Sequence, residues 1–144
     1  MRRAAILALL ALAAGCDATR YYSGAKEQNV EVKASFDGAP ATLAVYRLDN
    51  SCTAQYEGVI DLDKPSIQLG LPPDRPSLLV FELAAKGLLL GNTSIKKEAP
   101  IRPRPGYRYE ASASYRGSAL EVSVREIDPR SGASRELDLR RRCG

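Results

Sequence analysis

The sequence of 144 residues contains no histidine. This absence excludes Ser-His-Asp and Cys-His catalytic arrangements and the usual zinc sites, and it removes the commonest general base of enzymes. The chain also lacks a glycine-rich phosphate-binding loop. Enzymes that use paired carboxylates or a Ser-Lys pair remain compatible with this composition.

Large aromatic residues and net charge are also scarce. The chain has no Trp and two Phe, so we expect a core of Leu, Val and Ala with Tyr at its edges. The 21 basic and 17 acidic residues give a net charge of +4. Two of the basic residues, Arg2 and Arg3, stand at the N-terminus. Without a clustered basic face, a nucleic-acid partner is not expected.

The N-terminus has the organisation of a secretory signal peptide. Arg2 and Arg3 precede the uncharged, mostly apolar run Ala4–Ala14, and small residues lie at the expected cleavage position. A transmembrane helix needs roughly 20 apolar residues, so this run is too short to be one. We predict a helical signal peptide over residues 1–15.

The end of this segment, Leu12-Ala13-Ala14-Gly15-Cys16, resembles the lipobox of bacterial lipoproteins. The resemblance implies that Cys16 carries a diacylglycerol and an N-acyl chain, and no other cofactor is expected. Several acyl chains make membrane anchoring stable. Asp17 follows Cys16 directly, and by resemblance to enterobacterial lipoproteins it favours the inner membrane, facing the periplasm. The outer membrane is the alternative, since other bacteria sort by other rules.

The remaining cysteines form an even pair. With Cys16 assigned to the lipid, Cys52 and Cys143 are left in an oxidising compartment, where disulfides persist. We predict a Cys52–Cys143 disulfide that encloses nearly the whole domain. In the chain-entropy model such a bridge stabilises the fold by roughly 4–5 kcal/mol.

Three segments make up the expected domain organisation: a signal peptide at 1–15, a lipidated tether at 16–28 and a folded domain at 29–144. The polar residues 17–28 would reach about 40 Å at most when extended. Tyr21 and Tyr22 within them suit either a lipid interface or a plain linker.

Alternating apolar and polar residues predict strands throughout the folded domain. We expect them near 30–36, 41–48, 59–62, 66–71, 78–83 and 88–95, followed by 107–115, 120–125 and 137–140. The last three form a three-stranded antiparallel meander with one solvated face. Residues 85–87 and 99–106 are expected as a turn and a loop.

This pattern predicts an all-β protein with no helix after the signal peptide. About seven or eight short strands at this spacing favour an antiparallel β-sandwich, immunoglobulin-like or transthyretin-like. The apolar stretch Ser77–Leu90 is expected to be its central hairpin, and an exposed docking surface is the alternative.

Two arginine-rich segments are candidate contacts for an anionic partner. Their residues are Arg102, Arg104, Arg140, Arg141 and Arg142. Guanidinium groups recognise carboxylates and phosphates, including lipid headgroups. The alternatives are a rigid solvated connector for the first segment and a charged edge strand for the second.

The acidic residues are densest between positions 49 and 63. They are Asp49, Glu57, Asp61 and Asp63, with Asn50 among them. Their spacing matches neither a glycosidase pair nor a calcium loop, so a solvated edge is the favoured interpretation. No catalytic residue and no metal ligand is assigned.

These observations predict a membrane-anchored lipoprotein with a non-enzymatic binding or assembly role in the cell envelope, and an envelope protein as its partner. In layout the chain is similar to the small sandwich lipoproteins that tether envelope machines such as the type VI secretion system. One alternative is a periplasmic inhibitor, similar in size, lipidation and disulfide to the lysozyme inhibitors, or a small-ligand or glycan-binding module. Another is a carboxylate-based hydrolase. A docking protein should expose a broad apolar or Tyr-rich patch, a ligand module a concave pocket, and a hydrolase two carboxylates across a cleft.

Overall fold

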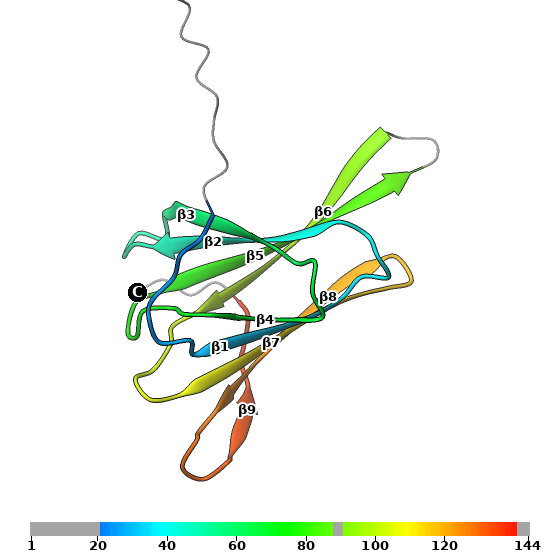
Figure 1. Cartoon of the computed structure of the whole chain (residues 1–144). Coiled ribbons are helices and arrows are strands. Elements are labelled where there is room, and N and C mark those ends of the chain that lie inside the picture. The colour runs from blue at the N-terminus through cyan, green and yellow to red at the C-terminus, as the bar shows by residue number, and fades with distance from the viewer. Residues whose placement is uncertain (1–20, 88–90, 141–144) are drawn as a thin grey trace, which may run out of the picture.

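Two β-sheets packed face to face make up the protein (Figure 1). The computed structural model describes residues 21–87 and 91–140, without the side chains of 85–87, 91 and 92. The strands are β1 (Val30–Ser35), β2 (Ala41–Leu48), β3 (Ala54–Asp61), β4 (Ser66–Leu69), β5 (Ser77–Gly87), β6 (Gly91–Ile101), β7 (Arg108–Arg116), β8 (Ala119–Ile127) and β9 (Ser134–Glu136). Over these ranges no helix is long and apolar enough to span a membrane.

The sheet orders are β4-β1-β7-β8-β9 and β3-β2-β5-β6, which confirms the all-β sandwich. The predicted meander is present as β7-β8-β9. One pair, β1 with β7, is parallel, and the other pairs are antiparallel. In an immunoglobulin sandwich the first two strands share a sheet. Here β1 and β2 lie in different sheets. Of the two expected arrangements, immunoglobulin-like and transthyretin-like, the strand order therefore agrees with the transthyretin-like one.

Period-two alternation places one face of each strand in the core. Leu43 and Val45 of β2 are fully buried, as are Leu79 and Phe81 of β5. Burying an aliphatic or aromatic side chain of this kind contributes about 1.5–3 kcal/mol. The core is mainly Leu, Val and Ala as expected, and Tyr109 is the exception because its ring is buried rather than at the edge.

Two predicted boundaries between strands are wrong. Residues 85–87 belong to β5 and not to a turn, since Gly87 pairs with Gly91. Strand β6 continues to Ile101 and includes Pro100, which was expected in a loop. Proline cannot donate to a strand ladder, but β6 is the edge strand of its sheet, where one missing donor is tolerated.

Strands β3 and β9 also differ from the prediction. Strand β3 begins at Ala54. Val45 pairs with Gly58 and Tyr46 with Tyr56, so Glu57 is an extra residue that forms a bulge on β3 and hides the alternation in the sequence. Strand β9 ends at Glu136, before the predicted range begins. Leu137 and Leu139 then pack against the core outside any strand.

Residues 21–28, here called the strap, pack against the sandwich instead of extending from it (Figure 1). Tyr22 donates its backbone N–H to Val59 (3.0 Å) and its hydroxyl to the Gly70 carbonyl (2.8 Å). A Cβ on Gly58 would lie 2.6 Å from the Tyr22 backbone, and one on Gly70 would overlap the Ala25 carbonyl oxygen. Only glycine permits this close approach, so Gly58 and Gly70 leave the space in which the strap packs.

The strap joins β1 through a buried amide. Asn29 accepts a hydrogen bond from the Leu71 backbone N–H and donates one to the Leu71 carbonyl, both at 2.8 Å. These two bonds satisfy the polar groups of Asn29 and Leu71, which are both buried. They fix the entry of the strap into the sandwich.

Cys52 lies in the connection between β2 and β3 and takes part in a disulfide. The predicted partner, Cys143, lies outside the described residues together with Arg141 and Arg142, so the Cys52–Cys143 pairing stays a prediction. The signal peptide and the lipidation residue Cys16 are likewise outside the described ranges.

Candidate functional site

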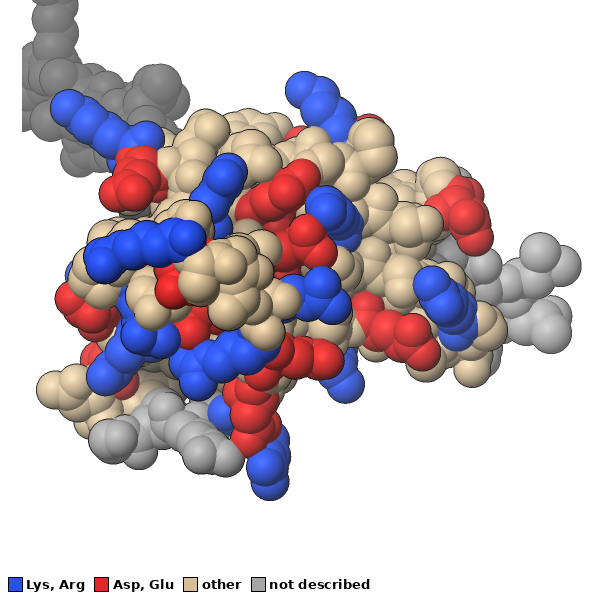
Figure 2. Space-filling model, turned by 90° about the horizontal axis from the view of Figure 1, so that it is seen from below, with Lys and Arg blue, Asp and Glu red and all other residues tan. Residues whose placement is uncertain are grey.

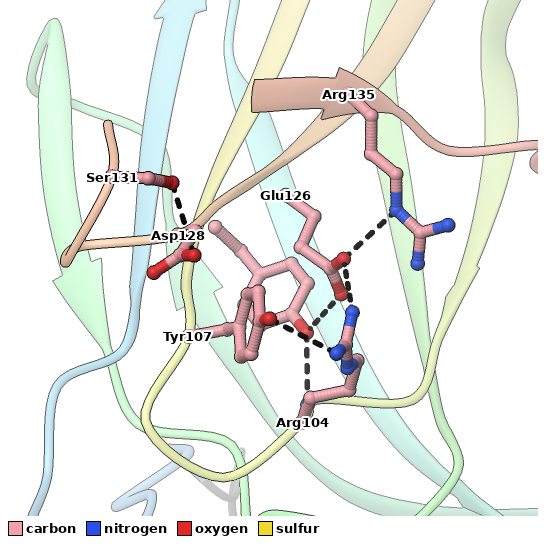
Figure 3. A network of polar contacts seen from close by, with 7 residues as sticks. Arg104, Tyr107, Glu126, Asp128, Ser131 and Arg135 are labelled. Atoms are coloured by element: carbon pink, nitrogen blue, oxygen red, sulfur yellow. Dashed lines mark hydrogen bonds and ion pairs between the residues drawn. The ribbon is translucent and has the colours of Figure 1, made fainter. Parts of the chain in front are cut away.

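A buried carboxylate at one end of the sandwich collects three hydrogen-bond donors (Figure 3). Glu126 on β8 is 4% exposed. It accepts hydrogen bonds from the Tyr109 hydroxyl (2.7 Å), the Arg104 guanidinium (3.0 Å) and the Arg135 Nε (2.9 Å). Strand register explains the grouping, because Glu126 pairs directly with Tyr109 on β7 and with Arg135 on β9.

Arg104 closes the connection between β6 and β7 over this carboxylate. Its backbone N–H donates to the Tyr109 hydroxyl at 2.8 Å. Its guanidinium donates to the Tyr107 hydroxyl (3.0 Å) and lies 3.9 Å from the centre of the Tyr107 ring. A cation over an aromatic face adds to the attraction. We call Arg104, Tyr107, Tyr109, Glu126 and Arg135 the Glu126 clamp.

The clamp shifts the titration of two of its members. Burial would raise the pKa of Glu126, but the hydrogen bonds from Tyr109 and Arg135 and the charges of both arginines outweigh burial and lower it. Burial, with the hydrogen bond to Glu126, raises the pKa of Tyr109 to about 12, against the opposing hydrogen bond from the Arg104 backbone. At neutral pH Glu126 is therefore ionised with both oxygens occupied, which suits a structural clamp rather than a proton-transfer group.

The structure separates the two arginines predicted to act together. Arg104 is engaged with Glu126 and Tyr107 inside the chain. Arg102 is exposed, and no ion pair among the described residues includes it. Arg140 is exposed and pairs with its neighbour Asp138 at 2.9 Å. Of the five predicted contacts, Arg102 alone is described as an exposed cation outside these ion pairs.

A small hollow of about 310 Å³ opens beside the clamp. Asp128 also lines it and accepts hydrogen bonds from the backbone N–H of Arg130 (2.9 Å) and the hydroxyl of Ser131 (3.0 Å), which lower its pKa. Two arginines and two carboxylates line this hollow, so their charges balance. It therefore selects neither anions nor cations by charge.

A larger hollow, of about 670 Å³, lies at the opposite end of the sandwich. It is bounded by the connections between β1 and β2 and between β3 and β4. Phe36 and Leu62 give it an apolar floor, while Asp37, Asp61 and Asp63 contribute carboxylates. We call it the open-end hollow. Its size falls within the range of small-ligand sites.

The other predicted acidic residues are not gathered there. Asp49 accepts hydrogen bonds from the backbone of Ser51 (2.9 Å) and Thr53 (2.8 Å) in its own turn. Glu57 pairs with Arg75 at 2.8 Å. Within the described ranges, no three metal-ligating side chains lie close enough to hold an ion.

The outer face of the four-stranded sheet is rich in tyrosine and aliphatic side chains. Since Leu43 and Val45 point inward, Ala44 and Tyr46 point outward. Their register partners Val59 and Tyr56 on β3, and Val80 on β5, share this face. The Tyr46 and Tyr56 rings meet edge to face at 5.4 Å. Together with Tyr21, which bridges to Val59, these six residues form what we call the tyrosine face.

The outer face of the five-stranded sheet is charged instead. Glu31 and Lys33 of β1, Glu110 of β7 and Arg125 of β8 lie there, and Lys33 pairs with Glu110 at 2.6 Å. Figure 2, which views the molecule from this side, shows basic and acidic side chains interspersed. The outer face of the four-stranded sheet also carries charges, at Asp61, Glu82, Lys96 and Glu98, and these lie outside the tyrosine face.

Sequence reasoning missed both the Glu126 clamp and the tyrosine face. The signal for the clamp is the parity of β8: Leu120, Val122 and Val124 alternate, and Glu126 continues their series toward the interior. A carboxylate in that place requires partners. The tyrosine face had no local signal, because the bulge at Glu57 on β3 breaks the alternation between Tyr56 and Val59.

Neither the models of known protein families nor the curated protein sequences match this chain.

Proposed function

We propose that this protein is a membrane-anchored lipoprotein with a non-enzymatic binding or assembly role on the periplasmic side of the bacterial cell envelope. Its only covalent addition is the lipid on Cys16, and its partner is an envelope protein. The inner membrane is favoured by Asp17. The lipobox-like sequence before Cys16 supports the anchor.

The strap is the observation that carries this proposal. With Cys16 lipidated, four residues separate it from Tyr21, and an extended chain from Cys16 to Tyr21 spans about 18 Å at most. The strap itself is held by hydrogen bonds to Val59 and Gly70. A domain on so short a lead stays at the bilayer surface, which suits a fixed element of an assembly better than an enzyme that searches the periplasm.

The Glu126 clamp supports the non-enzymatic part. It is the most buried carboxylate of the described residues, and its three donors come from the chain itself. A carboxylate that serves as a catalytic acid or base needs a pKa near the working pH and access to substrate. Glu126 has a lowered pKa and is buried.

Lipid labelling and crosslinking in living cells test the proposal. Wild-type protein should incorporate an alkyne-bearing palmitate and fractionate with membranes, and the Cys16→Ser variant should do neither. Crosslinking followed by mass spectrometry should recover one stoichiometric envelope protein with the wild type. Recovery of no protein partner at good crosslinking yield would overturn the assembly role, and an unlabelled wild type would overturn the anchor.

A second candidate, a small-ligand or glycan-binding module, is favoured by the open-end hollow. Its apolar floor and carboxylate rim fit a ligand with an apolar body and cationic or hydroxyl groups. Titration of the protein with soluble peptidoglycan fragments, followed by NMR, tests this. Shifts confined to residues 35–42 and 61–65 would support it, and none at millimolar ligand would exclude it for these glycans.

A further inference from the structure

We propose that the tyrosine face lies against the headgroup layer of the membrane in which Cys16 is anchored. This inference rests on the proposed lipid anchor. It adds an orientation: the four-stranded sheet faces the bilayer, and the five-stranded sheet faces away from it.

The first argument is where the anchored chain enters the fold. Tyr21 is the last residue before the short lead to Cys16, and it forms a parallel bridge with Val59 on β3. Strand β3 is one of the two edge strands of the four-stranded sheet. The anchor is therefore confined to within about 18 Å of one border of the tyrosine face, and that face is the nearest broad surface for the bilayer to meet.

The second argument is the chemistry of the face. Tyr21 is 66% exposed and Tyr56 is 46% exposed, and they are the exposed large hydrophobic residues of the described chain. Tyrosine combines an apolar ring with a polar hydroxyl and is favoured where hydrocarbon meets headgroups. Ala44, Val59 and Val80 fill the space between the rings without adding charge, and Glu98 of β6, the register partner of Val80, limits the face on that side.

The third argument is the border of the face. One register row further along the sheet, Asp61, Thr42, Glu82 and Lys96 lie side by side, and Lys96 pairs with Glu82 at 3.2 Å. This charged row limits how far the apolar area extends. An apolar area of this limited extent suits shallow contact with headgroups, and not insertion into the hydrocarbon.

The opposite sheet supplies the contrast. Its outer face carries the Lys33–Glu110 ion pair and Arg125, and basic and acidic side chains are interspersed on it (Figure 2). Removing such charges from water is costly, so this face remains hydrated. The six residues of the tyrosine face carry no charge, so this area can meet the headgroup layer without that cost.

The absence of tryptophan allows a sharp test. The variant Tyr56→Trp carries one tryptophan on the tyrosine face, and the matched control Ser123→Trp carries one on the exposed outer side of β8. Each full-length, lipidated protein is purified from membranes and reconstituted in phosphatidylethanolamine–phosphatidylglycerol vesicles. The vesicles contain a phospholipid brominated near the top of its acyl chains. Intact mass first establishes the lipid on Cys16.

The expected result is that Tyr56→Trp loses most of its emission to the brominated lipid and is protected from acrylamide, whereas Ser123→Trp shows the reverse. A Tyr21→Trp variant should behave like Tyr56→Trp. It provides a second probe on the same face in case one of the two variants misfolds. Equal quenching of both faces, or none, in a lipidated protein would overturn the orientation and leave the anchor intact. Blue-shifted but unquenched emission would mean that protein covers the face, which also overturns it. An unmodified Cys16 would overturn both proposals.

Discussion

Replacing Tyr109 by Phe removes one hydroxyl from the Glu126 clamp and keeps the buried ring. The hydroxyl donates to the ionised Glu126 at 2.7 Å and accepts from the Arg104 backbone at 2.8 Å. A hydrogen bond to a charged group contributes about 1.5–3 kcal/mol. Arg104 is exposed, so water can replace its lost acceptor at little cost. We therefore expect Tyr109→Phe to lower the free energy of unfolding by about 2–3 kcal/mol.

Urea denaturation at neutral pH measures this loss, with unchanged m-values as the check for two-state behaviour. Tyr115→Phe is the matched control. Tyr115 lies on the same strand, its ring is partly buried against the core, and no hydrogen bond of its hydroxyl is seen within the described part of the chain. Its removal should cost less than about 0.5 kcal/mol. Equal losses for the two variants would refute the importance of the Tyr109–Glu126 bond.

The raised pKa of Tyr109 adds a second, independent readout. Its pKa is about 12 in the folded protein against 10.0 ordinarily. A group whose pKa is raised by folding stabilises the fold below its ordinary pKa, and this contribution is lost as the pH rises through the folded value. The difference in stability between wild type and Tyr109→Phe should therefore be constant up to about pH 10 and shrink toward pH 12. A difference that stays constant across this range would contradict the shift.

Three further predictions concern the clamp, the strap and the disulfide. Because folding lowers the pKa of Glu126, this carboxylate stabilises the fold above its ordinary pKa of 4.5, and the contribution is lost as the pH falls through the folded value. In urea titrations at several pH values, Glu126→Gln should therefore lose less stability than the wild type as the pH is lowered. An equal loss in both proteins would argue against the shift. In Gly70→Ala the new Cβ would overlap the Ala25 carbonyl oxygen and displace the strap. Amide hydrogen exchange at residues 21–28 should therefore accelerate while the amides of β7 stay protected. Acceleration in both segments would indicate general unfolding instead. Cys52→Ser should lower the free energy of unfolding by about 2–5 kcal/mol, and a reductant should destabilise the wild type by the same amount. If Cys52 and Cys143 pair with each other, alkylation without reductant should leave both unmodified, as measured by intact mass.

The sequence predicted the meander because its alternation has one simple cause. Strands β7 and β8 each have one face in the core and one in water, so Tyr109, Ala111 and Ala113 alternate with polar residues. The same cause made the all-β fold class predictable. Where both faces of a strand carry apolar residues, as along Leu78–Leu83 of β5, the sequence has no alternation. The apolar run then indicates a strand without showing where it ends.

The strap shows what local patterns cannot reveal. Residues 21–28 are polar and read as a linker, yet Gly58 and Gly70, far along the chain, leave the space in which they pack. Nothing near either glycine in sequence distinguishes it from a turn residue. The same holds for Arg104, whose surroundings of proline suggested an exposed connector, although its charge compensates a carboxylate from a distant strand.

The disulfide at Cys52 and the buried polar contacts of Asn29 and Glu126 lie at one end of the sandwich. Because the described strands reverse direction in turn, the connections β2–β3, β4–β5 and β6–β7 share one end, where Cys52, the strap entry at Asn29 and the Glu126 clamp lie (Figure 1). The polar side chains of Asn29 and Glu126 there bond within the chain. The open-end hollow lies at the other end, and its connections carry Asp37, Asp61 and Asp63, for which no hydrogen bond of the side chain is seen within the described residues. The internal polar contacts and the open-end hollow thus lie at opposite ends of the strand axis, and substitution of the exposed Asp63 or Lys64 removes none of the contacts at the other end, whereas Phe36 and Leu62 belong to the core.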